Sequence, residues 1–117
     1  MNIVLIGSGN IATHLGKAFT DAGHHVAQVY SRTLANASAL ANVLSAQAID
    51  NLSQLNPHAD LYLLAVSDSA ITELVQALPK DLEGIVAHCS GATDLAVLNP
   101  FKNHGVIYPV QSFSKQK

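Results

Sequence analysis

The chain has 117 residues, 49% of them hydrophobic and 12% charged, and this composition predicts one domain with a packed core and excludes a disordered chain. Its net charge of −2 and its 6 scattered Lys and Arg residues leave no basic face for the phosphates of a nucleic acid. No apolar run approaches the roughly 20 residues of a membrane span, and the first residues lack the basic region of a signal peptide. We therefore expect partners other than nucleic acid or a membrane.

The first part of the chain alternates between short apolar runs and helical spacing. Residues 3–6 form a continuous apolar run, which predicts a strand buried on both faces. A helix is expected next, ending before Gly23, because glycine is typical just after a helix end. Residues 26–30 predict a second strand, 34–44 a second helix and 48–49 a short third strand. The apolar face expected for the first helix consists of Ile11, Leu15, Ala18, Phe19 and Ala22.

The second part repeats this alternation. After a turn or short helix over 51–57, residues 61–66 form the most apolar run of the chain and predict a central strand. A helix should follow, capped by the polar residues at 67–69. Further strands are expected at 85–87 and 105–108, separated by a turn and a short helix. The inner face expected for the capped helix consists of Ile71, Leu74, Val75 and Leu78.

Strands that alternate with helices predict a mainly parallel sheet with helices on both of its faces. Five or six strands in so short a chain indicate a single α/β domain with a three-layer α/β/α Rossmann fold.

The turn after the first strand reads Gly7-x-Gly9-x-x-Ala12. Gly7 permits a sharp turn, Gly9 lets a pyrophosphate approach the backbone, and Ala12 lets the helix lie close to the sheet. The start of the helix then offers free N–H groups and a partial positive charge, and Asn10 adds a side-chain donor. This pattern favours a dinucleotide site, while a corner shaped only by packing, or a site for another ligand such as S-adenosylmethionine, stays an alternative.

The end of the second strand discriminates between dinucleotides. An acidic residue there holds the ribose 2′-hydroxyl in NAD-binding domains, but this chain has Ser31, Arg32 and Thr33, and Asp21 lies too early. The guanidinium of Arg32 suits a phosphate, and the two hydroxyl groups add donors. We therefore predict NADP as the cofactor in preference to NAD. The alternative is an exposed arginine in a loop.

Five stretches of the sequence carry a family resemblance, namely IGSGNIATHLGKAF, VYSRT, LLAVSDSAI, HCSGATDL and GVIYPVQSFS. Together they resemble the N-terminal Rossmann domain of bacterial NADP oxidoreductases of the coenzyme F-420-dependent type. These relatives of pyrroline-5-carboxylate reductase continue into a helical C-terminal domain of uncharacterised function. The likeness spans nearly the whole chain, so we expect residues 1–117 to be the NADP-binding domain, with the helical domain absent from this chain.

The resemblance implies a cytoplasmic oxidoreductase that binds NADP(H) and a small-molecule substrate, with a homodimer as a further expectation. A module that senses NADP(H) or binds a protein without turnover is the alternative, and hydride transfer to a deazaflavin rests only on the family name. The cofactor-binding residues that the resemblance implies are Gly7, Ser8, Gly9, Asn10, Ile11, Ser31, Arg32, Thr33, Val66, Ser67 and Asp68.

Candidates for acid–base chemistry are few. His88 and Ser90 lie where the resemblance implies the nicotinamide, but a strand-end histidine and a helix-capping serine explain them better. Cys89, the single cysteine, has no base nearby in sequence, cannot form an intrachain disulfide and reads as a small buried residue. The histidines lack the spacing of metal ligands, so we expect no metal. The segment YPVQSF at 108–113 faces the cleft or leads to a further domain, and both alternatives stay open.

Overall fold

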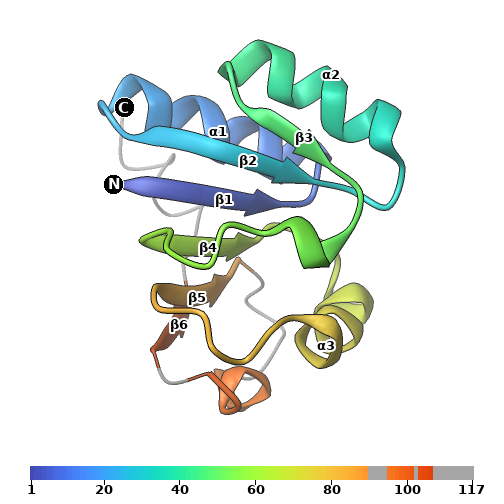
Figure 1. Cartoon of the computed structure of the whole chain (residues 1–117), viewed down its shortest axis with the longest axis vertical. Helices are drawn as coiled ribbons and strands as arrows, with labels where there is room; N and C mark the ends of the chain where they lie inside the picture. Colours follow the sequence, from blue (N-terminus) through green and yellow to red (C-terminus); the bar gives the residue numbers. More distant parts are fainter. Residues whose placement is uncertain (90–94, 102, 107–117) are drawn as a thin grey trace.

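Six parallel strands form one sheet in the order β3-β2-β1-β4-β5-β6 (Figure 1). The structure is a computed structural model that describes residues 1–89, 95–101 and 103–106. The strands are β1 (Asn2–Ile6), β2 (His25–Tyr30), β3 (Gln47–Ile49), β4 (Leu61–Leu64), β5 (Ile85–His88) and β6 (His104–Val106). The α-helices are α1 (Asn10–Asp21), α2 (Leu34–Leu44) and α3 (Asp68–Ala77), and two short 3₁₀ helices are η1 (Leu52–Gln54) and η2 (Leu95–Leu98).

The core lies in two layers, one on each face of the sheet. Side chains alternate along a strand, so Ile3 and Leu5 of β1 pack with residues of α1 and α2, whereas Val4 and Ile6 pack with residues of α3 and η2. All four side chains have 0% exposure, as expected for a parallel strand covered on both faces. The predicted three-layer α/β/α Rossmann fold is confirmed.

The order of the strands creates a point of divergence beside β1. The chain moves outward from β1 through β2 to β3 and then returns to β4, which pairs with the other side of β1 (Figure 1). The connections that leave β1 and β4 therefore run to opposite faces of the sheet. In open α/β sheets, ligands bind at the carboxyl ends of the strands at such a point.

Two of the expected element details are wrong. The central strand β4 ends at Leu64 and not at Val66, because β1 leaves the sheet at Gly7 and the last bond between them runs from Ala65 N to Ile6 O at 2.9 Å. Ser67 holds the N-cap position of α3 but makes no side-chain capping bond, and its Oγ lies 3.3 Å from Ser69 Oγ instead.

The buried face of α1 also differs from the expected one. Ile11 is 45% exposed and Ala22 is exposed, whereas the buried positions are Ala12, Leu15 and Gly16. A Cβ on Gly16 would lie 2.6 Å from Leu44 Cδ1, so the absence of a side chain there lets α1 pack against α2. The buried side of α1 is therefore set by close helix–helix packing, and Ile11 is left facing outward.

The other expected elements are present. The short third strand, the turn or helix at 51–57 and the Gly23 helix end all occur, with Gly23 at φ +93°. The last described strand covers 104–106, and the remainder of the expected 105–108 strand lies outside the described residues. Within the part of the chain that the structure describes, no helix has the length and hydropathy needed to cross a bilayer.

Candidate functional site

A crevice of about 690 Å³ opens at the carboxyl ends of β1, β2 and β4. This volume lies in the range of pockets that hold cofactors and other small molecules. The crevice therefore occupies the place that the strand order indicates. It is lined by Gly7, Ser8, Gly9, Asn10, Ile11, Tyr30, Ser31, Arg32, Ala65, Val66, Ser67, Ala70 and Leu74.

Gly7 is a glycine because the fold requires one. Its φ of +127° lies in the region that other residues rarely adopt, and a Cβ would lie 2.3 Å from the carbonyl oxygen of Ala65. Its N–H donates to Tyr30 O at 2.8 Å, which ties the turn to the end of β2. Gly7 thus brings the ends of three neighbouring strands together at the base of the crevice.

Gly9 differs, because nothing in the described protein requires a glycine there. Its φ of −81° is available to every residue, and a Cβ would meet no atom within 4 Å. Gly9 is exposed and lines the crevice. The space that its missing side chain leaves open is therefore accessible to a ligand that approaches the backbone.

The turn leads directly into the start of α1. Gly9 is the N-cap residue, so no side chain caps the first N–H groups of the helix, and Ser8, Asn10 and Ile11 line the crevice beside it. Both the N–H and the Oγ1 of Thr13 donate to Gly9 O at 2.9 Å, which fixes the carbonyl away from these donors. Free N–H groups and the partial positive charge of a helix N-terminus together favour an anion.

The end of β2 forms a second, polar part of the crevice. Ser31 is half-buried, and its N–H donates to Ile49 O at 3.2 Å. The side chain of Arg32 is 72% exposed, and its Nη2 lies 3.5 Å from Glu73 Oε2. Thr33 is exposed at the N-cap position of α2, and its N–H donates to Ser31 Oγ at 3.3 Å. A guanidinium and a hydroxyl group therefore lie at one end of the crevice.

The comparisons with known proteins agree with this geometry. A family model described as the Rossmann-like domain matches residues 1–111. The chain belongs to the Rossmann-like domain family. No curated protein matches it.

Solved structures extend this assignment. The Rossmann-like domain superposes on a candidate NADP oxidoreductase from Bacteroides fragilis with a TM-score of 0.82 and 37% identity, over 92% of this chain and 43% of that one. This match confirms the predicted resemblance to the Rossmann domain of NADP oxidoreductases. The chain spans less than half the length of that protein.

Two more distant structures share the fold. Prephenate dehydrogenase from A. aeolicus, solved with hydroxyphenyl propionate and NAD⁺, gives a TM-score of 0.75 at 14% identity, over 91% of this chain and 40% of that one. Biliverdin reductase from Synechocystis, solved with biliverdin and NADP⁺, gives a TM-score of 0.69 at 15% identity, over 90% of this chain and 37% of that one. Proteins solved with NAD⁺ and with NADP⁺ thus share this architecture, so the fold alone does not select between them.

Most of the sequence-predicted cofactor residues of the Rossmann-like domain meet at the crevice. Those that line it are Gly7, Ser8, Gly9, Asn10, Ile11, Ser31, Arg32, Val66 and Ser67. Thr33 is not a lining residue, since it precedes α2 at the surface, and Asp68 is the first residue of α3, so its assignment to the cofactor stays a prediction.

Sequence reasoning missed four lining residues of the Rossmann-like domain. Tyr30 and Ala65 immediately precede predicted site residues, and strand ends that meet at one edge of a sheet would have indicated them. Ala70 and Leu74 lie four residues apart in α3 and therefore share a helix face, which the spacing could have shown. Leu74 was expected in the core, and it is half-buried because it also faces the crevice.

The one acid–base candidate that the structure describes, His88, does not line the crevice. His88 is fully buried at the end of β5, and Cys89 is 8% exposed. Burial raises the pKa of the Cys89 thiol to about 12, which agrees with its interpretation as an unreactive residue. Ser90 and the segment 108–113 lie outside the described residues, so catalytic roles for His88 and Ser90 stay predictions. Among the described residues, no group of three His, Cys, Asp or Glu side chains could hold a metal ion.

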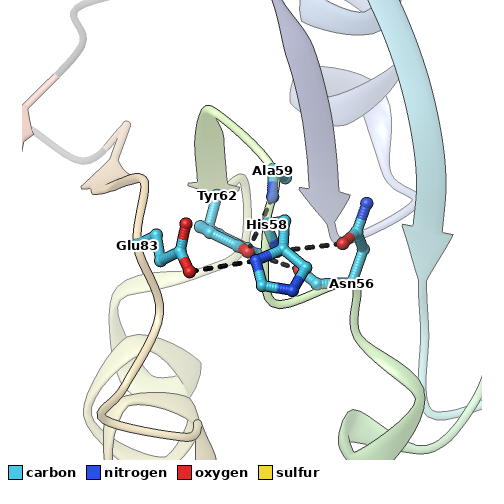
Figure 2. Close-up of polar contacts among 5 residues, drawn as sticks. All are labelled: Asn56, His58, Ala59, Tyr62 and Glu83. Atoms are coloured by element: carbon cyan, nitrogen blue, oxygen red, sulfur yellow. Dashed lines mark hydrogen bonds and ion pairs between the residues drawn. The ribbon is translucent and has the colours of Figure 1, made fainter.

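The opposite edge of the sheet, at the amino ends of the strands, carries a network of hydrogen bonds beside a smaller pocket of about 290 Å³. Figure 2 shows the buried Tyr62 donating its hydroxyl hydrogen to Asn56 O and accepting from Ala59 N at 3.1 Å. His58 Nδ1 lies 3.0 Å from Glu83 Oε2, and His58 N donates to Asn56 Oδ1 at 2.9 Å (Figure 2). The loop before β4 is therefore held by Tyr62 of β4, by Glu83 before β5 and by its own Asn56 side chain.

Proposed function

We propose that this Rossmann-like domain binds a nicotinamide dinucleotide in the crevice, with the pyrophosphate against the glycine turn and the start of α1. Gly9 carries the proposal. Neither its φ nor its packing requires a glycine, so the open space beside its backbone is best explained by a ligand that must approach closely. The residues present fit such a group, because N–H donors and a helix N-terminus face the same space.

NADP is the proposed form of the cofactor. Arg32 offers a planar, permanently charged group at the end of β2, where no carboxylate occurs between positions 30 and 34. Ser31 lines the crevice next to it, and Thr33 adds a hydroxyl group at the start of α2. A 2′-phosphate would receive charge-assisted hydrogen bonds from such a set. The name of the Bacteroides fragilis protein supports the same choice.

The whole protein is proposed to be an oxidoreductase that acts on a small molecule, with this chain as its cofactor-binding domain. When bound, the nicotinamide supplies the hydride chemistry. The described residues of this chain bind and orient the cofactor, with Val66, Ser67 and Asp68 following β4 along its edge. The 43% coverage of the Bacteroides fragilis protein supports an arrangement in which further residues complete the substrate site.

A second candidate function is binding of NADP(H) without turnover. One observation favours it: His88, the acid–base candidate that the structure describes, is fully buried. A domain of this kind would sense the cofactor or pass its signal to a protein partner. Steady oxidation of NADPH by the chain in the presence of imine or keto compounds would contradict this alternative.

A fluorescence titration tests the cofactor. We expect NADPH to bind the wild-type chain about tenfold more tightly than NADH, because charge-assisted bonds to a phosphate are strong. Arg32→Ala should remove most of that difference and leave NADH binding nearly unchanged. Equal NADPH affinity of the wild-type and Arg32→Ala chains would show that the phosphate site has been assigned wrongly.

A further inference from the structure

Arg32 lines the crevice and lies beside Glu73 of α3, a helix whose Ala70 and Leu74 also line it. Arg32 follows β2, whereas Glu73 belongs to α3, 41 residues further along the chain. Nη2 of Arg32 lies 3.5 Å from Oε2 of Glu73. The guanidinium proposed to bind a 2′-phosphate therefore already faces an anion of the protein itself.

We propose that Glu73 is a selectivity-determining residue, which competes with the 2′-phosphate of NADP for Arg32 and so reduces the preference for NADP over NAD. This inference rests on the proposed function of the crevice and adds a residue that the glycine turn and the end of β2 do not contain.

The position of Glu73 on α3 supports this role. Ala70 and Leu74 line the crevice, and residues three and four apart share one side of a helix. Glu73, three residues after Ala70 and next to Leu74, therefore lies on the crevice side of α3. Its side chain is 71% exposed, so it stands at the mouth and not in the packed core.

The charges give the direction of the effect. A 2′-phosphate brings up to two negative charges to Arg32, and a carboxylate 3.5 Å from the same guanidinium would then lie close to them. The phosphate must either displace Glu73 from Arg32 or share the guanidinium with it, and both weaken binding. The 2′-hydroxyl of NAD carries no charge, so the same carboxylate hardly affects it.

Stability does not explain this pair. Both side chains are more than 70% exposed, and ion pairs of such exposure contribute little to the stability of the fold. Removing the charge of Glu73 should therefore leave the melting temperature close to that of the wild type. An effect on NADPH binding can then be separated from an effect on folding.

A titration with NADPH and NADH at low ionic strength tests the inference. The matched control is Glu83→Gln, since Glu83 is also an exposed carboxylate in an ion pair, with His58, at the opposite edge of the sheet. Glu73→Gln should tighten NADPH binding by about threefold to tenfold and change NADH binding less than about twofold. The gain should shrink as salt is added, because both charges are exposed. Glu83→Gln should change neither affinity.

Different failures have different meanings. If the wild type binds NADPH and Arg32→Ala weakens it, but Glu73→Gln behaves like Glu83→Gln, the role of Glu73 is overturned and the proposed function stands. The role of Glu73 is also overturned if Glu73→Gln tightens NADPH and NADH equally. If the wild type binds neither dinucleotide, the proposed function fails and this inference fails with it. In an Arg32→Ala background the gain from Glu73→Gln should largely disappear, as competition for one guanidinium requires.

Discussion

Polar groups are arranged differently at the two edges of the sheet where the strands begin (the amino edge) and where they end (the carboxyl edge). At the amino edge, polar groups of the loop before β4 have protein partners, as Asn56 O and Ala59 N do in the hydroxyl of Tyr62 (Figure 2). At the carboxyl edge, the start of α1 lines a crevice of about 690 Å³, and Gly9 leaves space that no atom of the described residues fills. Polar groups that a fold leaves facing a cavity are available for a ligand, and this difference supports the proposed binding site at the carboxyl ends of the strands.

The largest effect that we expect is a loss of stability when Gly7, at the carboxyl edge of the sheet, is replaced. Gly7→Ala places a Cβ 2.3 Å from Ala65 O at a φ of +127°, and Gly84→Ala places one 2.3 Å from Ala59 O at the other edge. We expect Gly7→Ala to lower the free energy of unfolding by about 3–6 kcal/mol, because backbone strain and overpacking add. Urea denaturation measures this change in the free energy of unfolding. An unchanged midpoint for Gly7→Ala would contradict the structural role of this glycine.

The rate at which Cys89 is alkylated tests whether the end of β5, further along the carboxyl edge, is accessible to reagents. With a pKa raised from 9.0 to about 12, the native thiol has a much smaller thiolate fraction at pH 8. Alkylation by iodoacetamide should therefore be about a thousandfold slower in the native chain than in urea, since the thiolate is the nucleophile. Mass spectrometry of quenched samples gives both rates. Similar rates would mean that the end of β5 is accessible, and that Cys89 is a candidate for chemistry after all.

The substitution Tyr62→Phe tests the hydrogen bonds at the amino edge of the sheet. Tyr62→Phe leaves the N–H of Ala59 and the carbonyl of Asn56 without their hydroxyl partner, and should cost about 1–3 kcal/mol of stability. Burial raises the pKa of Tyr62 above its ordinary value of 10.0. The stability that the neutral hydroxyl of Tyr62 contributes to the fold is therefore complete below pH 10, and it is lost as the pH rises through the folded-state pKa.

Thermal unfolding between pH 7 and 11 checks both expectations for Tyr62. The wild type should lose stability above pH 10 more steeply than Tyr62→Phe, which has no hydroxyl group to ionise. NADPH affinity at pH 7 should be the same in the two chains, because Tyr62 does not line the crevice. A change of affinity in Tyr62→Phe would mean that the two edges are coupled.

Local pattern and the family resemblance together were enough to predict the fold and nine of the thirteen residues that line the crevice. Continuous apolar runs such as 61–64 identify parallel strands because both faces are buried, and Gly7 and Gly9 mark the turn because their spacing reflects backbone geometry. Arg32 could be selected because the end of the second strand has a fixed place in such a sheet.

Contacts between segments far apart in the chain could not be predicted from local sequence patterns. Hydrophobic spacing treats every apolar residue as core, so it placed Ile11 and Leu74 on buried helix faces, although both line the crevice. The approach of Glu73 to Arg32 joins residues 41 apart, and it depends on how α3 packs beside β2. The end of β4 at Leu64 depends on where its neighbour β1 leaves the sheet, which no local pattern contains.

The most direct measurement compares NADPH binding by Gly9→Ala and Gly105→Ala. At both glycines a Cβ would have no atom of the described residues within 4 Å, so both variants should fold with nearly the wild-type melting temperature. We predict that Gly9→Ala loses about tenfold in NADPH affinity, because the added methyl group holds the pyrophosphate away from the backbone, and that Gly105→Ala loses none. Wild-type NADPH affinity in Gly9→Ala would contradict the close approach of a pyrophosphate to this turn.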